Sequence, residues 1–89
     1  MTAGDLPDLI VRLRQLRPAF ADDEEGFIAL EKTIFVAERT EGHHPERTRE
    51  MAARALAAML DRPPEGVRAG LIECASVAAL LAAGRGETS

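Results

Sequence analysis

The feature of this sequence that most constrains its fold is a nearly uninterrupted run of apolar and small residues from 67 to 83. Only Arg68, Glu73 and Ser76 interrupt it. A helix that is apolar on nearly every side has to be covered on nearly every side. We therefore expect residues 65–83 to form the central helix of a small all-α domain, or a contact between its subunits.

Small residues recur at every fourth position of this run, from Gly66 and Gly70 onward through Cys74, Ala78 and Ala82. This spacing places them on one face of a helix, where a second helix backbone could approach closely. From this face and its apolar neighbours we predict an interface formed by Gly70, Leu71, Cys74, Val77, Ala78 and Leu81.

Three more helices are predicted upstream, at about 5–17, 22–41 and 45–61. Asp5 and Asp22 are suitable N-caps for the first two, and Gly42 and Pro45 mark the break before the third. Four helices with short connections are typical of an antiparallel up-and-down bundle. We expect one helical domain over residues 1–84 and a frayed tail over residues 85–89.

The second predicted helix has two apolar seams, one through Phe27, Leu30, Ile34 and Ala37 and the other through Ile28 and Phe35. Two seams indicate two neighbouring helices. Glu31 and Glu38, one heptad apart, fall between the seams, where a helix covered on two sides should be apolar. Such local inconsistencies are where functional sites are sought.

These glutamates suggest a metal site as an alternative function. The candidate ligands, for iron, manganese or zinc, are Glu31, Glu38, Glu41 and His44. Di-metal carboxylate bundles use inward-facing Glu residues together with Glu-x-x-His pairs, and Glu41 and His44 have that spacing. However, Gly42 and Pro45 flank His44, and the second Glu-x-x-His would have to come from another protomer.

Size and composition limit the remaining classes of function. The chain has 89 residues and a formal net charge of -4. A domain of this size removes only about 60% of its unfolded surface on folding, which favours a homo-oligomer. Lys32 is the only lysine among many arginines, which suggests a GC-rich genome and a small protein of bacterial type.

We expect the protein to lie in the cytoplasm. Cys74 is the only cysteine, which excludes an intramolecular disulfide, and residues 1–8 lack the pattern of a signal peptide. The apolar run is shorter than the roughly 20 residues of a bilayer span and carries two charges, so no membrane segment is expected.

A DNA-binding regulator is the second alternative, because helices could present Arg47, Arg49 and Arg54 to a groove. The acidic balance gives no general attraction to nucleic acid and argues against it. No catalytic residues or cofactor are predicted, since Cys74 and Ser76 lie in the apolar run, far from either histidine. The leading hypothesis is a non-enzymatic interaction module, an adaptor or small subunit that binds itself and another protein through an apolar helix face.

Overall fold

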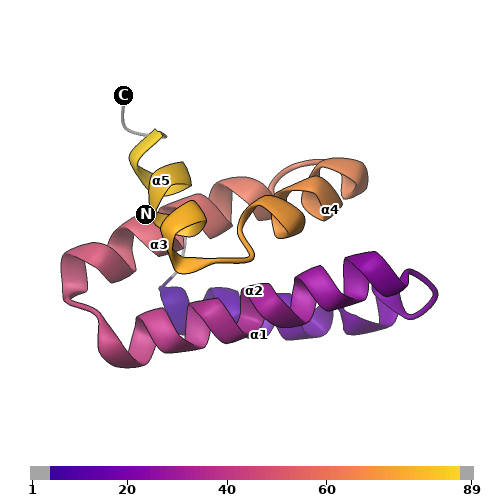
Figure 1. The fold of residues 1–89 in the computed structure, drawn as a ribbon, viewed down its shortest axis with the longest axis horizontal. Helices are drawn as coiled ribbons and strands as arrows, with labels where there is room; N and C mark the ends of the chain where they lie inside the picture. Colours follow the sequence, from indigo (N-terminus) through magenta and orange to yellow (C-terminus); the bar gives the residue numbers. More distant parts are fainter. Residues whose placement is uncertain (1–4, 87–89) are drawn as a thin grey trace.

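The computed structural model describes residues 5–86 and folds them into five α-helices and no strand (Figure 1). The predicted all-α class is thus confirmed. The helices are α1 (Leu6–Gln15), α2 (Glu24–His43), α3 (Glu46–Leu60), α4 (Pro64–Glu73) and α5 (Val77–Gly86), with a 3-10 turn, η1 (Arg17–Phe20), after α1. Residues 85 and 86 belong to α5, whereas 87–89 of the predicted tail lie outside the described residues. None of the helices in this range is long and apolar enough to cross a membrane.

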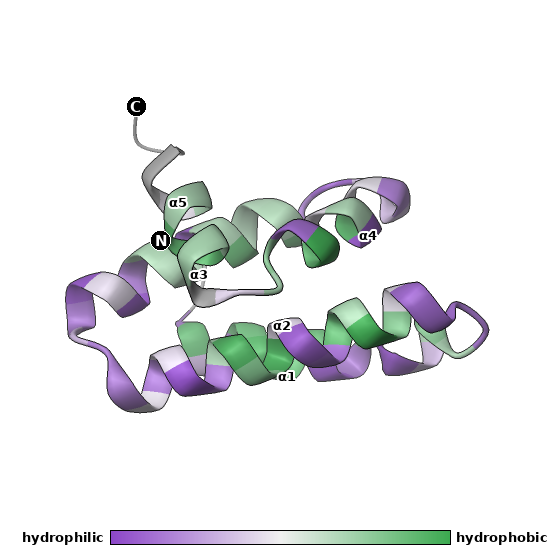
Figure 2. Ribbon diagram, in the orientation of Figure 1, coloured by the Kyte–Doolittle hydropathy of each residue, from purple (hydrophilic) through white to green (hydrophobic). Residues whose placement is uncertain are grey.

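The helices form two layers (Figure 1). The antiparallel hairpin of α1 and α2 makes one layer, and α3, α4 and α5 make the other, with α4 packed on α2 and α5 on α3. Hydrophilic residues gather at the connection between α2 and α3, and along α2 they alternate with hydrophobic stretches (Figure 2). Every helix contributes to the core, whose largest fully buried side chains include Leu9, Leu13, Leu30, Leu56, Met59, Leu71 and Leu80.

The prediction of one helix over 65–83, and with it the four-helix count, is wrong, because the segment breaks between α4 and α5. Ser76, which looked like a mere interruption of the apolar run, caps α5: its Oγ accepts the amide proton of Ala79 at 3.2 Å. The break lets the apolar segment pack as two short helices, α4 mainly on α2 and α5 mainly on α3, instead of crossing the domain as one rod.

The segment is also not more central than the other helices. Leu6, Leu9, Ile10 and Leu13 of α1 are all buried, whereas Ala78 of α5 is exposed and Leu81 is half-buried. The core is therefore shared between the two layers and does not surround one central helix.

A buried threonine joins the two layers at the break. The hydroxyl of Thr33 in α2 lies 2.9 Å from the carbonyl oxygen of Leu71 in α4. In a continuous helix that carbonyl would accept the amide proton of Ala75, but α4 ends at Glu73. The hydroxyl also lies 2.8 Å from the Ala29 carbonyl, which already has its own partner in the α2 ladder. The Leu71 carbonyl therefore depends on Thr33.

The second packed face of α2 is not the predicted seam through Ile28 and Phe35. The residues that face the other layer include Ala29, Thr33, Val36 and Thr40, which are buried, while Ile28 and Phe35 are exposed. α2 does have neighbours on two sides, α1 and α4. The small and hydroxyl-bearing side chains on the second side let α4 pack closely.

Glycine permits close helix contacts at two places in the second layer. A Cβ added to Gly70 would lie 2.2 Å from Cγ of Met59, and one added to Gly84 would lie 2.3 Å from the backbone oxygen of Met51. Both partners belong to α3. At Gly70 the space is filled by the Met59 side chain, whereas the α3 backbone itself approaches only at Gly84.

Some predicted helix ends are shifted. α1 ends at Gln15, and residues up to Phe20 form η1. The N-cap of α2 is Asp23, not Asp22, and its carboxylate accepts the amide proton of Gly26 at 3.0 Å. α2 continues through Gly42, which has open space around its α-carbon, and Pro45 is the residue before α3.

Replacing Thr33 with valine should remove the partner of the buried Leu71 carbonyl. We expect Thr33→Val to lower the free energy of unfolding by about 1 to 3 kcal/mol, the cost of an unsatisfied buried group. Thr40→Val is the matched control, because the Thr40 hydroxyl contacts only the Val36 carbonyl of its own helix. Urea unfolding of both variants measures the difference, and equal losses would contradict the role given to Thr33.

Candidate interaction surface

The outer face of α2 carries large apolar side chains that nothing within residues 5–86 fully covers. Ile28 is 46% exposed and Phe35 is 58% exposed, although their neighbours in the sequence, such as Ala29 and Ile34, are buried. At about 100° per residue, Glu24, Ile28, Lys32, Phe35 and Arg39 lie within about 80° of the helix circumference. We call these five residues the α2 outer stripe.

Arg39 partly shelters the ring of Phe35, the one aromatic residue of the stripe. Its guanidinium carbon lies 5.5 Å from the centre of the Phe35 ring. This cation-π contact is weak at an exposed site, on the order of 0.5–1 kcal/mol. It fixes a positive charge beside the ring and still leaves more than half of Phe35 in contact with solvent.

A further exposed apolar side chain lies on the neighbouring helix. Ile72 of α4 is 43% exposed, and it follows Leu71, whose carbonyl binds Thr33 of α2. Of the large apolar side chains that the structure describes, the exposed ones are Ile28 and Phe35 on α2, Ile72 on α4 and Val11 on α1. Single exposed apolar residues are ordinary, but several on adjacent helices suggest a contact surface.

The charges of the α2 outer stripe change sign along the helix. Glu24 lies at its start, and Lys32 and Arg39 lie in its middle and second half. Within residues 5–86, none of the three forms an ion pair. The stripe therefore presents an acidic residue at its start, two apolar side chains with Lys32 between them, and a basic residue at its end.

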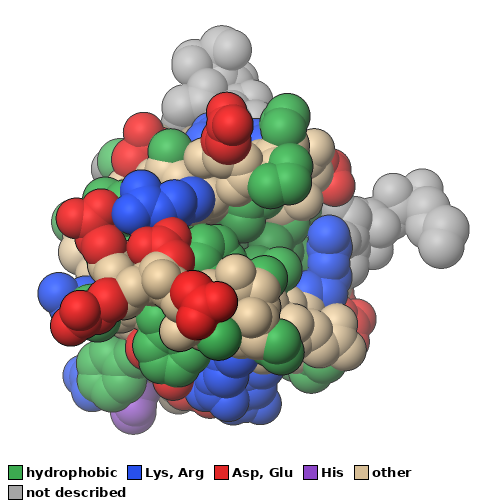
Figure 3. Space-filling view, turned by 90° about the vertical axis from the view of Figure 1, so that its right-hand side faces the viewer, with side chains coloured by type: hydrophobic (Ala, Val, Ile, Leu, Met, Phe, Trp, Pro, Cys, Tyr) green, Lys and Arg blue, Asp and Glu red, His purple; other side chains and the backbone are tan. Residues whose placement is uncertain are grey.

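An ion-pair cluster lies beside the acidic end of the stripe and holds α4 against the start of α2. Nε of Arg68 lies 2.6 Å from Asp23, and its Nη2 lies 2.9 Å from Glu25. A shallow hollow lined by Glu24, Glu25 and Ile28 adjoins this cluster. Figure 3 shows acidic and basic side chains crowded at this end of the molecule, with hydrophobic ones between them.

Asp23 has two roles in this cluster, since it both caps α2 and binds Arg68. The hydrogen bond from Arg68, followed by that from the Gly26 amide, holds the pKa of Asp23 below its ordinary value. Sequence reasoning missed this pair, because Arg68 appeared only as an interruption of the apolar run. Nothing in the sequence links it to Asp23, which lies 45 positions earlier.

The glutamates that looked inconsistent in the sequence are paired with arginines of the first layer. Glu38 binds Arg14 of α1, and Glu31 binds Arg17 of η1 with 3.1 Å between Nε and Oε2. These side chains are roughly two-fifths exposed. They form the polar edge of the α1 and α2 contact and do not point into the bundle.

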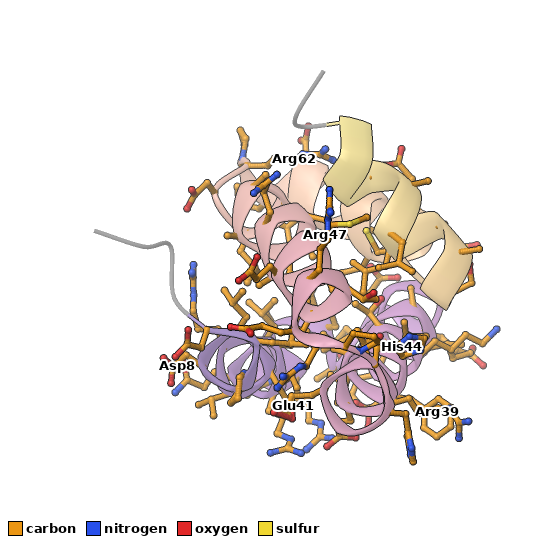
Figure 4. The ribbon with its side chains drawn as sticks, turned by 90° about the vertical axis from the view of Figure 1, so that its left-hand side faces the viewer. Asp8, Arg39, Glu41, His44, Arg47 and Arg62 are labelled. Atoms are coloured by element: carbon orange, nitrogen blue, oxygen red, sulfur yellow. The ribbon has the colours of Figure 1, made fainter. Side chains whose placement is uncertain are left out.

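The four predicted metal ligands do not come together. Glu31 and Glu38 are held by arginines, and Glu41 lies 3.8 Å from Arg49 of α3. Glu41 and His44 lie on different sides of the end of α2 (Figure 4). Among the described residues, no group of three or more His, Cys, Asp or Glu side chains could hold a metal ion.

The predicted interface residues are divided by the break in the apolar segment. Gly70, Leu71 and Cys74 are buried inside the chain, Leu81 is half-buried and Ala78 is exposed. The side chain of Val77 lies outside what the structure describes. Burial raises the pKa of the Cys74 thiol, and the charge of Glu73 adds to this effect, so the thiol is a poor nucleophile.

The arginines considered for DNA binding do not form a basic face on α3. Arg47 and Arg54 are exposed, whereas Arg49 is half-buried beside Glu41. Figure 4 shows Arg47 and Arg62 on this layer. Glu46 and Glu50 are exposed on the same helix, which dilutes its positive charge.

Comparison with protein-family models, curated proteins and solved structures gave no match for this chain.

The ion pairs of Glu31 and Glu38 can be tested together. Because both pairs are exposed, we expect Glu31→Gln combined with Glu38→Gln to lower the free energy of unfolding by about 1 kcal/mol or less. Adding iron, manganese or zinc should leave the melting temperature of the unmodified protein unchanged. A metal-dependent rise that disappears in the double variant would instead support a metal site.

The Asp23 and Arg68 pair predicts a dependence of stability on pH. A carboxyl whose pKa is lowered in the folded state stabilises the fold above its ordinary pKa of 3.8, and this contribution is lost as pH falls through the folded pKa. Asp23→Asn should therefore lower the melting temperature at neutral pH, and the difference from the unmodified protein should shrink below about pH 4. Asp22→Asn is the control, because Asp22 is exposed and forms no ion pair within residues 5–86, so this variant should change the melting temperature little.

Proposed function

We propose that this chain is a helical interaction module, an adaptor or small subunit, that binds a protein partner through the α2 outer stripe. The exposure of Ile28 and Phe35 on one face of α2 carries the proposal. Both lie on a helix whose other faces are already packed, so they add nothing to the core of the domain.

The physical cost of this arrangement supports a binding role. Burying a side chain such as Phe or Ile stabilises a protein by about 1.5–3 kcal/mol relative to leaving it exposed. Here two such residues on a single stripe are left in solvent, with charged residues on either side. An apolar centre with a polar rim is the usual composition of a protein interface.

This surface differs from the interface first predicted for the apolar segment. Gly70, Leu71 and Cys74 already make contacts within the chain, so a partner at those positions would have to displace α3. The α2 outer stripe is accessible without any rearrangement, and we therefore propose it as the contact face.

The test is to place a photo-crosslinking phenylalanine analogue at position 35 in cells that make the protein. We expect a protein adduct of discrete mass at position 35 that is absent when the analogue replaces Val11. Val11 is the matched control, because it is 48% exposed but lies alone on α1. Ile28→Asp in the same chain should weaken the adduct at least about tenfold, which corresponds to 1.4 kcal/mol.

Two results would overturn the proposed contact face: the analogue gives no protein adduct at position 35, or it gives the same adducts at position 35 as at position 11. The unfolding curve of Ile28→Asp is measured alongside, and it should change little because the side chain is exposed.

A further inference from the structure

The order of residues along the α2 outer stripe gives it a symmetry of its own. The midpoint between Glu24 and Arg39 falls between residues 31 and 32 of the helix. The midpoint between Ile28 and Phe35 falls at the same place. Reversing the direction of the helix therefore places Glu24 where Arg39 was and Ile28 where Phe35 was. The stripe is complementary to itself in the antiparallel orientation.

We propose that the partner of the stripe is a second copy of this chain, bound antiparallel about a two-fold axis that passes near Glu31 and Lys32. This inference rests on the proposed function, since it names the partner of the same surface. In a two-fold interface each contact occurs twice. Ile28 of each copy packs against Phe35 of the other, and Glu24 of each copy faces Arg39 of the other.

The distribution of ion pairs favours this partner. On the flank of α2 that faces α1, Glu31 and Glu38 are paired with arginines, and at its start Asp23 and Glu25 are paired with Arg68. On the outer stripe, Glu24 and Arg39 have no ion-pair partner within residues 5–86. An antiparallel copy supplies an opposite charge to both at once, which fixes orientation and register.

The spacing suits a helix crossing of ordinary size. At 1.5 Å per residue, Ile28 and Phe35 are separated by about 10 Å along the axis, and Glu24 and Arg39 by about 22 Å. The apolar pairs thus lie next to the crossing point and the charged pairs lie outside them. Lys32 lies near the axis, and its flexible stem can extend sideways so that its ammonium group stays in solvent.

The small number of apolar side chains sets the strength of this contact. Interfaces below about 1,200 Å² are weak and transient, so we expect half-dimerisation between about 1 µM and about 1 mM. Sedimentation equilibrium of the purified chain over this range should show a reversible monomer and dimer. A chain that remains monomeric throughout overturns the second copy as the partner.

Charge reversal tests the orientation. Glu24→Arg and Arg39→Glu each create like-charge contacts on both sides of the dimer, and each should weaken dimerisation about tenfold or more. An equimolar mixture of the two variants should dimerise as strongly as the unmodified protein, because every charged contact in the mixed dimer is again between opposite charges. Failure of the mixture to recover would overturn the antiparallel arrangement.

The chain offers matched controls for both reversals. Glu46 occupies the first position of α3 as Glu24 does that of α2, and Arg12 is exposed on α1. Glu46→Arg and Arg12→Glu make the same changes in net charge and should leave dimerisation unchanged. Circular dichroism of all four variants confirms that they keep the helical fold.

The outcomes separate this inference from the proposed function. An adduct at position 35 that joins two copies of the chain, together with a dimer in sedimentation, supports both. An adduct with a different protein and a monomer in sedimentation retains the contact face and overturns the second copy. No specific adduct and a monomer overturn both.

Discussion

The fold depends on how a chain this short covers one long apolar segment. A continuous helix over residues 65–83 would extend about 28 Å and would need neighbours along its whole length and on nearly every side. The chain instead breaks the segment at 74–76, so that α4 lies on α2 and α5 lies on α3. The break leaves the Leu71 carbonyl without its helical partner, and Thr33 supplies the missing hydrogen bond from the opposite layer. The break thus allows both halves of the segment to be covered, and the backbone carbonyl that it exposes is hydrogen-bonded at the same place.

Patterns of local sequence were sufficient for the helical class and the approximate position of the first three helices. They failed where a choice depended on contacts distant in sequence. Ser76 is a good N-cap, but a lone serine in an apolar run did not outweigh the continuity of that run. Thr33 and Thr40 looked polar, yet both are buried with hydroxyls bonded to backbone carbonyls, while the apolar Ile28 and Phe35 are exposed. Periodicity finds the faces of a helix but does not decide which of two moderately apolar faces is packed.

The charged residues of α2 have different partners on three parts of the helix. Toward α1 it carries glutamates that bind arginines, and at its start it carries Asp23, which closes the helix and binds α4. On its outer face the charges flank apolar side chains and have no such partners in the described residues. Glu31 and Glu38 looked inconsistent only because Ile28 and Phe35 were taken for a packed seam, and they instead lie at the polar edge of the contact with α1. The candidate site lies beside these glutamates on the outer face of α2, and of its residues Ile28 and Phe35 had been assigned from the sequence to a packed seam.

The position of Cys74 has a consequence for how the motions of this protein can be followed. It is the chain's only thiol, it is 4% exposed, and it ends α4 at the joint with α5. A thiol reagent can reach it only when that joint opens, so the labelling rate reports the population of the open joint. Proteins open in local units whose free energies lie below that of global unfolding. The native sequence therefore contains a single built-in probe of whether α5 detaches from α3 independently of the rest of the domain.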